Sequence, residues 1–548
     1  MATHPTAAEH EIFGMLFDEE ELVEYRKTVL DMVLVFLLVF VVLSTGYDAY
    51  SLLVSRAPLT AMSAQPPITR PTTPACVETV VQNQTFSSNS NQPYVGNYTS
   101  PTHCPAPWAM IVLDWNGRSP LNQLDRVGAL WLGRTEIFRT INPETSGVSW
   151  HVEKDVSEYS STFAQERNVT ALVLVPQGMI VVTASLTFYE SSSLVSPLDH
   201  SDVIIPLANV ATIPWARIDA GQSKQFDVAL PRNVVRASME VYATAHNCDE
   251  TWYSNNLVPN AGCQGSNFRE AFREIRIAVD GRLIGVVWPF PYIYTGGLNP
   301  DFWESIPAVN VLNIPPYHMD LTPFIGPLDD GLPHQISFQI VNNHGYWLID
   351  GNLMIYLDGK GQIVSGNLTQ ADIPSNAIEQ VESFGLAYTH VDRTNSVTGY
   401  VDTSGGRIVT SIRQTMQYVN YFLPNLLVPS IELRASTLLV TSETVSTPDG
   451  TVARTTLDSY SVTIREGLFR GNSVLLTTVT VDQAFRHIDL SGSGSSIAFA
   501  KSVSDAVHAE TFGTTSENYV VTDSSGFCYH RYLSASRGSI IQEQKLGC

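Results

Sequence analysis

The chain has 548 residues, of which 44% are hydrophobic and 15% are charged, and its formal net charge is -22. So much apolar material excludes wholesale disorder and allows several packed domains or a few large β units. The strong negative charge makes nucleic acids and anionic membrane surfaces poor partners, because both are themselves polyanionic.

The first apolar segment predicts a membrane anchor. An acidic tail, residues 1–28, ends in Arg26 and Lys27, and the unbroken apolar run 32–43 follows. Extended to 29–51, the run reaches the roughly 20 residues of a spanning helix, although a signal-peptide core has a similar length. The long acidic start argues against a signal peptide, and the two basic residues favour a cytoplasmic location for it. We therefore expect a single-pass type II membrane protein.

The residues beyond this anchor carry the marks of an oxidising, glycosylating compartment. Six cysteines follow it, and their short spacings suggest three local disulfides: Cys76–Cys104, Cys248–Cys263 and Cys528–Cys548. This is one of several connectivities that six cysteines allow, and free buried thiols are the alternative. Four glycosylation sequons begin at Asn83, Asn97, Asn168 and Asn367. We expect this part of the chain in the secretory or vacuolar lumen or outside the cell.

The rest of the chain reads as β structure. Residues 52–75 are rich in proline, which predicts an extended stalk. From Trp108 onward, short apolar or alternating runs between turn residues predict β-sandwiches or jelly rolls. Residues 275–287 predict a hairpin that turns at Asp280-Gly281. Residues 346–361 predict further turns, near Asp350-Gly351 and Asp358-Gly359.

Tryptophan is distributed unevenly. All nine Trp residues lie between Trp108 and Trp347, and none lies in the last 201 residues. Flat aromatic faces are what sugar rings pack against, while the alternative is that these rings fill sandwich cores. The asymmetry directs the search for a site to residues 108–350.

Familiar catalytic motifs are missing. The sequence has no GxSxG elbow, no HExxH and no Walker loop, and its 13 His residues lack ligand spacing. We therefore predict neither a cofactor nor a metal site, and the candidates are carboxylates near aromatic residues.

The stretch 122–139 places charges in apolar runs. Asp125 and Arg126 precede the run 127–132, and Glu136 and Arg139 lie inside the next. In a strand, Asp125 would share a face with Trp131, where desolvation can raise the pKa of an acid toward that of a working acid or base. A solvated strand end is the alternative.

Two later segments combine acids with aromatics. The first is the loop 245–255, which contains His246, Asp249, Glu250 and Trp252, and a merely solvated loop is its alternative. The second is 267–281, where Glu270 and Glu274 enter the predicted hairpin. Salt bridges on an exposed strand face are the alternative there.

These segments together resemble the peptide-N-glycosidase A family, the acidic peptide:N-glycanases of plants and fungi. The motifs that carry the resemblance are LDRVGALWLGRTEIFRT (124–140), WHVEKDVSEY (150–159), MEVYATAHNCDETWYSN (239–255), FREIRIAVDGRLIGVVWPFPYIYTGGLNP (272–300), IPPYHMDLTPFIG (314–326) and YWLIDGNLMIYLD (346–358). The resemblance implies hydrolysis of the amide between an Asn side chain and the first N-acetylglucosamine of an N-glycan. Asn becomes Asp, the glycan leaves as a glycosylamine, and no metal is needed. It also implies a fold similar to bacterial N-glycosidase F, with two jelly rolls side by side.

The resemblance further implies roles for single residues. The bacterial enzyme carries an essential Asp in a Trp-Asp-Arg sequence, to which Leu124-Asp125-Arg126 is similar. We expect Asp125 to be catalytic, with Glu250 as its partner carboxylate. We expect the substrate to be bound by Arg126, Trp131, His246, Trp252 and Glu270.

The predicted organisation is mainly β, with tandem jelly-roll β-sandwiches and a C-terminal β domain behind one N-terminal transmembrane helix. The predicted boundaries are 1–28 for the tail, 29–51 for the anchor, 52–75 for the stalk, 76–230 and 231–370 for the jelly rolls, and 371–548 for the C-terminal domain. We expect N-glycopeptides or unfolded N-glycoproteins as partners, contact with a membrane through the anchor, and no nucleic acid. The alternatives are a non-catalytic carbohydrate-binding or adhesion ectodomain and a structural cell-surface protein.

Overall fold

The computed structural model describes residues 59–547 except 89–91, 121–126, 194, 197–199, 211–212, 255–270, 362, 375–378, 384–385, 426–429, 471–474, 494–495 and 512. The expected tail and anchor therefore lie outside the described residues. In the part that is described, no helix is both long enough and apolar enough to cross a membrane.

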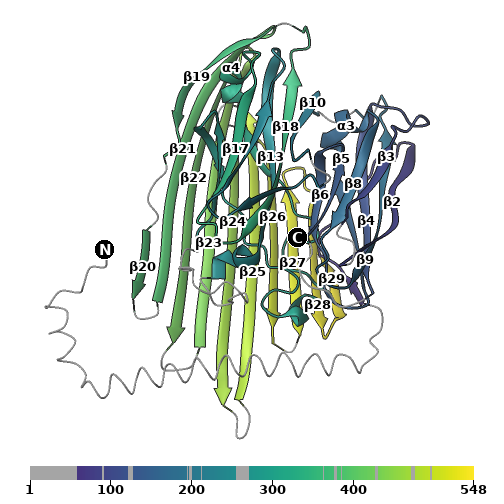
Figure 1. Cartoon of the computed structure of the whole chain (residues 1–548), viewed down its shortest axis with the longest axis vertical. Helices are drawn as coiled ribbons and strands as arrows, with labels where there is room; N and C mark the ends of the chain where they lie inside the picture. Colours follow the sequence, from purple (N-terminus) through teal and green to yellow (C-terminus); the bar gives the residue numbers. More distant parts are fainter. Residues whose placement is uncertain are drawn as a thin grey trace, which may run out of the picture. The chain divides into compact units, whose positions relative to one another are not determined.

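The described residues are mainly β, as predicted, and their strands form five sheets (Figure 1). Helical turns in this part of the chain are short: η1 Ser157–Tyr159, α3 Ser160–Phe163, η2 Asn247–Asp249, η3 Trp252–Ser254, η4 Pro300–Trp303, η5 Thr322–Phe324 and α4 Ile325–Leu328.

The first two sheets form a sandwich. One has the order β1-β7-β4-β9-β2 and the other β3-β8-β5-β6. Their strands are β1 Leu59–Ala61, β2 Ala75–Ser87, β3 Tyr94–Tyr98, β4 Trp108–Ser119, β5 Val127–Leu132, β6 Thr135–Ile141, β7 Val148–Asp155, β8 Arg167–Val173 and β9 Met179–Glu190. Alternate residues of both sheets, such as Leu113 and Leu130, meet in one apolar core.

The next two sheets form a second sandwich. One has the order β10-β18-β13-β16 with β11 paired to β18, and the other has the order β12-β17-β14-β15. Their strands are β10 Val203–Leu207, β11 Ala216–Asp219, β12 Ser223–Val228, β13 Val234–His246, β14 Glu274–Val279, β15 Arg282–Val287, β16 Tyr317–Asp320, β17 His334–Val341 and β18 Tyr346–Leu357. The strands β10 to β12 precede residue 231 but pair with this second sandwich. The jelly-roll boundaries themselves stay predictions.

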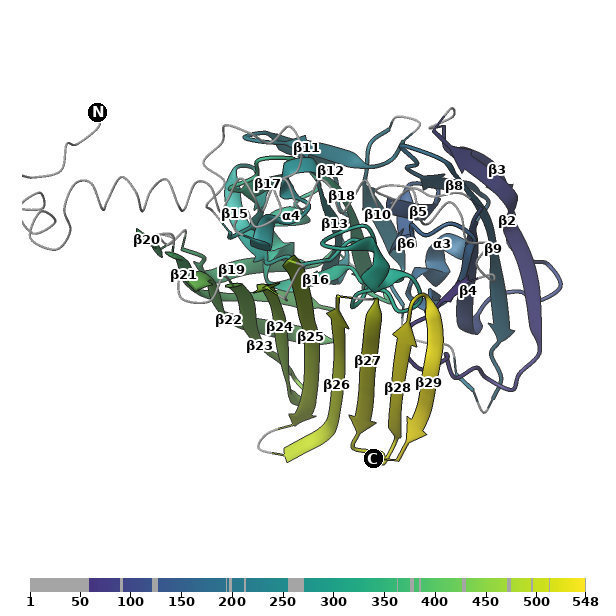
Figure 2. The same cartoon turned by 90° about the horizontal axis from the view of Figure 1, so that it is seen from below.

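The last third of the chain is one long antiparallel sheet. Its strands are β19 Ser365–Asp372, β20 Glu379–Ser383, β21 Leu386–Thr403, β22 Gly406–Asn425, β23 Ser430–Thr447, β24 Gly450–Arg470, β25 Leu475–Ser493, β26 Ser496–Glu510, β27 Thr514–Asp523, β28 Cys528–Ser536 and β29 Ser539–Leu546. Figure 2 shows β22 to β29 as a layer beneath the sandwiches. One face of this layer packs on the core of the second sandwich through residues such as Met416, Tyr460 and Val462.

The strand β5 explains why an unbroken apolar run can lie in a sheet. All six of its residues are buried. Leu130 and Leu132 face the core of the first sandwich, while Val127, Ala129 and Trp131 face the core that includes the second. A strand covered on both faces has no polar side to show, so its sequence does not alternate.

The first described residues of the expected stalk lie on the folded body. Leu59–Ala61 pairs with β7, and Ala64 is fully buried beside Ile306, Leu533 and Ala535. The backbone N–H of Ala64 donates to Glu517 of β27 at 2.7 Å. The stalk prediction is therefore wrong for residues 59–64, because apolar contacts and this hydrogen bond hold them on the folded body.

Two of the three predicted turns are confirmed. β14 and β15 turn at Asp280-Gly281, where both residues have positive φ, and β18 ends before a turn at Gly359. The turn at Asp350-Gly351 is wrong, since both residues lie inside the continuous strand β18. A Cβ on Gly351 would lie 3.1 Å from the side chain of Leu207, so this glycine allows close packing and does not mark a turn.

Candidate active site

The charges of the 122–139 stretch belong to a buried polar group between the sandwiches, called here the inter-sandwich cluster. Its members are Glu136 and Arg139 of β6, Lys154 of β7, Glu240 and Tyr242 of β13, and Asp350 of β18. A β-bulge explains why residues three apart share a face: Leu130 pairs with Phe138, but Trp131 pairs with Glu136, which leaves Ile137 extra.

Arg139 is the centre of this cluster. Its guanidinium makes two hydrogen bonds of 2.7 Å to the carboxylate of Glu136, and both side chains are fully buried. It also donates across to the second sandwich, to the backbone oxygen of Leu348 at 2.7 Å and the hydroxyl of Thr244 at 3.2 Å. Arg139 therefore ties β6 to β13 and β18 through charge-assisted bonds.

Asp350 supplies a second acid next to this ion pair. Burial raises the pKa of Asp350 well above its usual range, and the neighbouring negative charge of Glu136 adds to the effect. The indole N–H of Trp131 donates to Asp350 at 2.7 Å. Burial therefore favours the neutral form of Asp350, which contacts the first sandwich through Trp131.

Glu240 forms the other end of the cluster. Its carboxyl accepts hydrogen bonds from the hydroxyl of Tyr159 at 2.9 Å and the amide of Asn352 at 3.1 Å. Burial and nearby Glu158 raise the pKa of Glu240 to about 8. Nearby, the ammonium of Lys154 donates to the backbone oxygen of Ile137 and to Tyr242, and burial lowers its pKa.

No member of the cluster named above is more than 9% exposed, so a glycan cannot reach it. These side chains hold the two sandwiches in a fixed register. This structural role explains why charged residues occur within apolar strands. These side chains take no direct part in chemistry.

The predicted loop after β13 also contains a structural acid. Asp249 is fully buried and accepts two hydrogen bonds from Arg273, at 2.9 and 3.0 Å, and one from the indole of Trp347 at 2.6 Å. The backbone N–H groups of His344 and Gly345 complete its environment. Although burial opposes it, the charge of Arg273 and these hydrogen bonds keep the pKa of Asp249 below its usual range.

Glu274 has a comparable role. It is 1% exposed and accepts from Arg276 at 3.0 Å, from Trp288 at 3.0 Å and from Arg393 of β21 at 3.1 Å. The predicted salt bridges are thus present, but the prediction that they lie on an exposed strand face is wrong. Glu274 joins the second sandwich to the C-terminal sheet.

Three predicted substrate-binding residues are corrected by their burial. Trp131 is fully buried, and Trp252 is 7% exposed and packs on Tyr253 and Tyr418. His246 is 4% exposed, with its ring stacked on Tyr346, and burial lowers its pKa to about 3. None of these rings offers a free face to a sugar.

The same holds for every tryptophan of the chain. All nine are 7% exposed or less. The alternative interpretation is therefore the right one: two-sheet sandwiches need large side chains in their cores, and the single-layer C-terminal sheet does not.

The remaining site predictions divide into two groups. Asp125, Arg126 and Glu270 lie outside the described residues. Glu250 follows η2, is half-buried, and its backbone N–H donates to Asn247 at 3.0 Å. Its catalytic role stays a prediction.

Two strand ends and a turn meet at one place, called here the junction. Its segments are 142–144 after β6, 245–250 at and after β13, and the turn 294–297. The hydroxyl of Thr295 donates to the backbone oxygen of Asn142 at 2.7 Å, and the hydroxyl of Tyr294 donates to the backbone oxygen of Ala245. The turn thus joins the ends of both sandwiches.

Glu144 is an acid of the junction that the sequence analysis missed. It is 8% exposed and follows β6, whose last residue Ile141 pairs with Val127, the first residue of β5. An ideal Cβ on Gly296 would lie 2.1 Å from a carboxylate oxygen of Glu144. The carboxylate therefore lies directly against the backbone of the turn. The sequence signal that could have revealed it is the acid in INPETSG directly after a strand.

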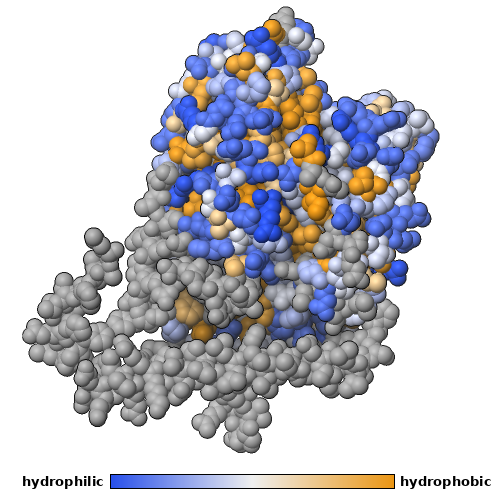
Figure 3. Space-filling view, in the orientation of Figure 1, coloured by the Kyte–Doolittle hydropathy of each residue, from blue (hydrophilic) through white to orange (hydrophobic). Residues whose placement is uncertain are grey.

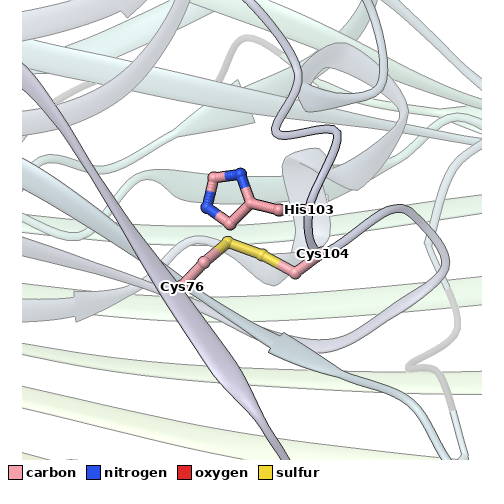
Figure 4. A group of neighbouring side chains, drawn as sticks. All are labelled: Cys76, His103 and Cys104. Carbon is pink, nitrogen blue, oxygen red and sulfur yellow. A yellow bond between two sulfur atoms is a disulfide. The ribbon is translucent and has the colours of Figure 1, made fainter.

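Two groups of potential metal ligands occur among the described residues. In the first, Cys76 and Cys104 form a disulfide beside His103, so neither sulfur is a thiolate (Figure 4). In the second, Asp114 and Glu153 lie near His151, but Arg70 already forms ion pairs with both acids. Neither group supports metal chemistry.

The structure bears on the predicted modifications as well. Cys76–Cys104 is confirmed. Cys248 and Cys528 are also disulfide-bonded, but Cys263 and Cys548 lie outside the described residues, so those two pairings stay predictions. All four sequon asparagines are exposed. The face of the molecule in Figure 3 is mostly hydrophilic, with hydrophobic residues gathered in a band near its middle.

Comparisons with known proteins agree on one family. Residues 66–374 match the sequence profile of the family described as peptide N-acetyl-beta-D-glucosaminyl asparaginase amidase A. A peptide-N4-(N-acetyl-beta-glucosaminyl)asparagine amidase A from Prunus dulcis is 28% identical over 526 residues, which cover 87% of this chain and 91% of the relative.

Solved structures show a weaker likeness. A crystal structure of a peptide-N(4)-(N-acetyl-beta-D-glucosaminyl) asparagine amidase has 14% identity and a TM-score of 0.35, covering 52% of this chain and 96% of the other. A structure of PNGF-II has 13% identity and a TM-score of 0.37, covering 52% of this chain and 66% of the other.

Proposed function

The chain belongs to the peptide N-acetyl-beta-D-glucosaminyl asparaginase amidase A family, and we propose from that membership that it releases N-glycans by hydrolysing their linkage to asparagine. The bond that breaks is the amide between the Asn side chain and the first N-acetylglucosamine. The observation that carries the proposal is the family match over residues 66–374, which include all the described strands of both sandwiches after β1.

The chemistry sets the requirements for the site. A water molecule must attack an unactivated amide carbon, a base must accept its proton, and the leaving nitrogen must receive one. Donors must also stabilise the negative charge on the amide oxygen. The products are a peptide with Asp and a glycosylamine, so the reaction balances without a metal or a cofactor.

We place this reaction at the junction. Asp125 comes two residues before Val127 in the sequence, and Glu250 comes four residues after His246. Val127 pairs with Ile141 at the end of β6, and the end of β13 is bonded to the turn that also contacts Asn142. Both strands that lead to the predicted carboxylates therefore end at the junction. Its position at the edge of the sandwiches also suits a bulky glycopeptide better than the inter-sandwich cluster does.

The test uses the full chain in mild detergent and a purified N-glycopeptide at mildly acidic pH. The products are identified by mass spectrometry. We expect a peptide with Asp at the glycosylated position. An Asn that keeps one N-acetylglucosamine would reveal an endoglycosidase, and an unchanged glycopeptide that stays bound would favour the carbohydrate-binding alternative.

Two variants connect the activity to the predicted residues. Asp125→Asn is expected to lose at least about a hundred-fold in kcat, the range of general acid–base catalysis. Glu250→Gln is expected to show a comparable loss if it is the partner carboxylate. Asp372→Asn, an exposed acid of β19, serves as the control and should keep full activity. Full release by Asp125→Asn would remove its assigned role.

We also propose the fold details and the location. The two sandwiches are jelly rolls, and the chain is a single-pass type II membrane protein anchored by 29–51 with its β domains in the secretory or vacuolar lumen or outside the cell. The confirmed disulfide and the exposed sequons support an oxidising, glycosylating compartment. Protease protection of sealed vesicles tests the topology: the β domains should survive, and their digestion would contradict it.

A further inference from the structure

We infer that the C-terminal sheet is a functional part of the amidase, in which Tyr418 and Asn420 of β22 are positioning residues for Glu250. This inference rests on the proposed function, in which Glu250 is the partner carboxylate. The strand β22 lies beyond residues 66–374, which match the family profile, so that match gives these two residues no role.

Both side chains point from the C-terminal sheet toward the second sandwich. Tyr418 and Asn420 lie two residues apart on β22, so they share one face of the strand. Tyr418 is 2% exposed and belongs to the core that the sheet shares with the second sandwich, and Asn420 is fully buried. Polar groups at this depth are hydrogen-bonded, so their partners show which parts of the chain they hold in place.

The first contact acts on the chain just after Glu250. The side-chain amide of Asn420 donates to the backbone oxygen of Tyr253 at 2.8 Å. Tyr253 lies in η3, three residues beyond Glu250, and is 1% exposed. Moving a buried carbonyl away from its donor is costly, so Asn420 restricts the position of the chain after Glu250.

The second contact acts on the chain just before Glu250, through one buried ion pair. The hydroxyl of Tyr418 donates to the backbone oxygen of Ala271. Two residues further on is Arg273, whose guanidinium makes two hydrogen bonds to Asp249. Asp249 immediately precedes Glu250 in the sequence. Tyr418 therefore fixes the segment that holds the residue next to Glu250.

Packing and charge reinforce these two hydrogen bonds. The ring of Tyr418 packs against both Trp252 and Phe272, with ring centroids 6.3 and 5.4 Å apart. Arg393 of the neighbouring strand β21 donates to Glu274 at 3.1 Å, directly after Arg273 in the sequence. The C-terminal sheet thus holds the chain on both sides of Glu250.

Position matters because proton transfer requires a close and aligned contact. A carboxylate that acts as a general acid or base must lie within hydrogen-bond distance of the atom whose proton it exchanges. A displacement of about 1 Å, caused by a change far from the reacting atoms, can cost about a hundred-fold in rate. Tyr418 and Asn420 are buried away from substrate, so their effect on the reaction passes through Glu250.

Two substitutions remove the contacts one at a time. Tyr418→Phe removes the hydroxyl that donates to Ala271 and keeps the packing of the ring, so this variant should fold. Asn420→Leu has nearly the same size and removes the donor to Tyr253.

Two controls separate positioning from general stability. Tyr421→Phe is the matched control, because Tyr421 lies on the opposite face of β22 and its hydroxyl donates to Glu432 of β23 at 3.2 Å. Val462→Ala makes a cavity in the core of the same sheet, where Val462 is fully buried, and leaves the two hydrogen bonds in place.

The experiment measures kcat and KM for glycopeptide release by full-length variants over a pH series, well below each thermal midpoint. We expect Asn420→Leu to lose about ten- to a hundred-fold in kcat and Tyr418→Phe to lose several-fold, with KM within a few-fold. The limb of the pH profile that Glu250→Gln removes should move in both variants. Val462→Ala should lower the thermal midpoint and leave kcat and that limb unchanged, and Tyr421→Phe should match the wild type.

The outcomes separate the inference from the proposed function. Wild-type release together with an unaltered kcat and pH profile in Tyr418→Phe and Asn420→Leu would overturn the inference and leave the proposed function standing. An equal loss of kcat in Val462→Ala would also overturn it, because the sheet would then act through stability alone. If Asn420→Leu does not fold, Tyr418→Phe decides by the same criteria.

Two further results bear on the premises. Full activity of Glu250→Gln would leave no carboxylate for these residues to position and would overturn the inference, while release by the wild type would still support the proposed function. A wild-type chain that releases no glycan would remove the proposed function, and the inference with it.

Discussion

The inter-sandwich cluster and the junction contain the same kinds of side chain and differ in burial. In the cluster, Glu136 and Arg139 are fully enclosed, and their hydrogen bonds span both sandwiches. At the junction, Glu250 follows the end of β13 and is half-buried. A buried carboxylate with a full set of partners stabilises a geometry, while a carboxylate at an edge can exchange protons with a substrate.

The largest expected effect comes from breaking the cluster at its centre. Arg139→Met would leave Glu136 buried without its counter-charge, which typically costs about 3–5 kcal/mol of unfolding free energy. Urea unfolding of the purified chain measures it. Arg407→Met provides the control, since Arg407 pairs with Asp402 on the surface, where solvent screens the pair, and the expected loss of unfolding free energy there is much smaller. Equal losses in both variants would contradict the structural role of the cluster.

The next effect is a dependence of stability on pH. The pKa of Glu240 is about 8 in the folded chain, because burial and Glu158 raise it from its ordinary value of 4.5. The folded state therefore keeps a proton that the unfolded state releases, so the contribution of Glu240 to the unfolding free energy should fall as pH rises from about 4.5 to about 8. A single group contributes at most about 1.4 kcal/mol per pH unit.

Unfolding curves at several pH values within that window measure the effect. Glu240→Gln should flatten the dependence, because an amide has no proton to lose. The burial-raised pKa of Glu517, about 7, acts in the same direction for the segment that contains Ala64. A pH dependence in Glu240→Gln that matches that of the wild type would contradict the protonated state assigned to Glu240.

A smaller change in stability distinguishes a tryptophan that packs in the core from one that binds a sugar ring. Trp131→Phe removes the N–H that donates a hydrogen bond to Asp350. We expect the unfolding free energy to fall by about 1–2 kcal/mol. Below the unfolding midpoint, the kcat and KM for glycopeptide should be unchanged. A raised KM with unaltered stability would restore the substrate-binding role that burial argues against.

The sequence predicted the β architecture and the turn at Asp280-Gly281 because alternation and turn chemistry are local properties. It failed at Asp350-Gly351, where the glycine serves the packing of Leu207 from a distant strand. It also could not reveal the bulge at Ile137 that aligns Glu136 with Arg139, since a bulge depends on the neighbouring strand. Glu144 escaped notice for the same reason: its significance comes from the contact with Gly296, 152 residues further along.

The central claim, that the chain hydrolyses the Asn-linked amide, is tested most directly by the reaction in water enriched in heavy oxygen. The full chain is incubated with an N-glycopeptide, and both products are analysed by mass spectrometry. We predict one heavy oxygen atom in the new Asp side chain of the peptide, because water attacks the amide carbon. An unlabelled peptide that retains Asn, with the heavy atom at the reducing end of the glycan, would show cleavage on the sugar side of the nitrogen and would contradict the account.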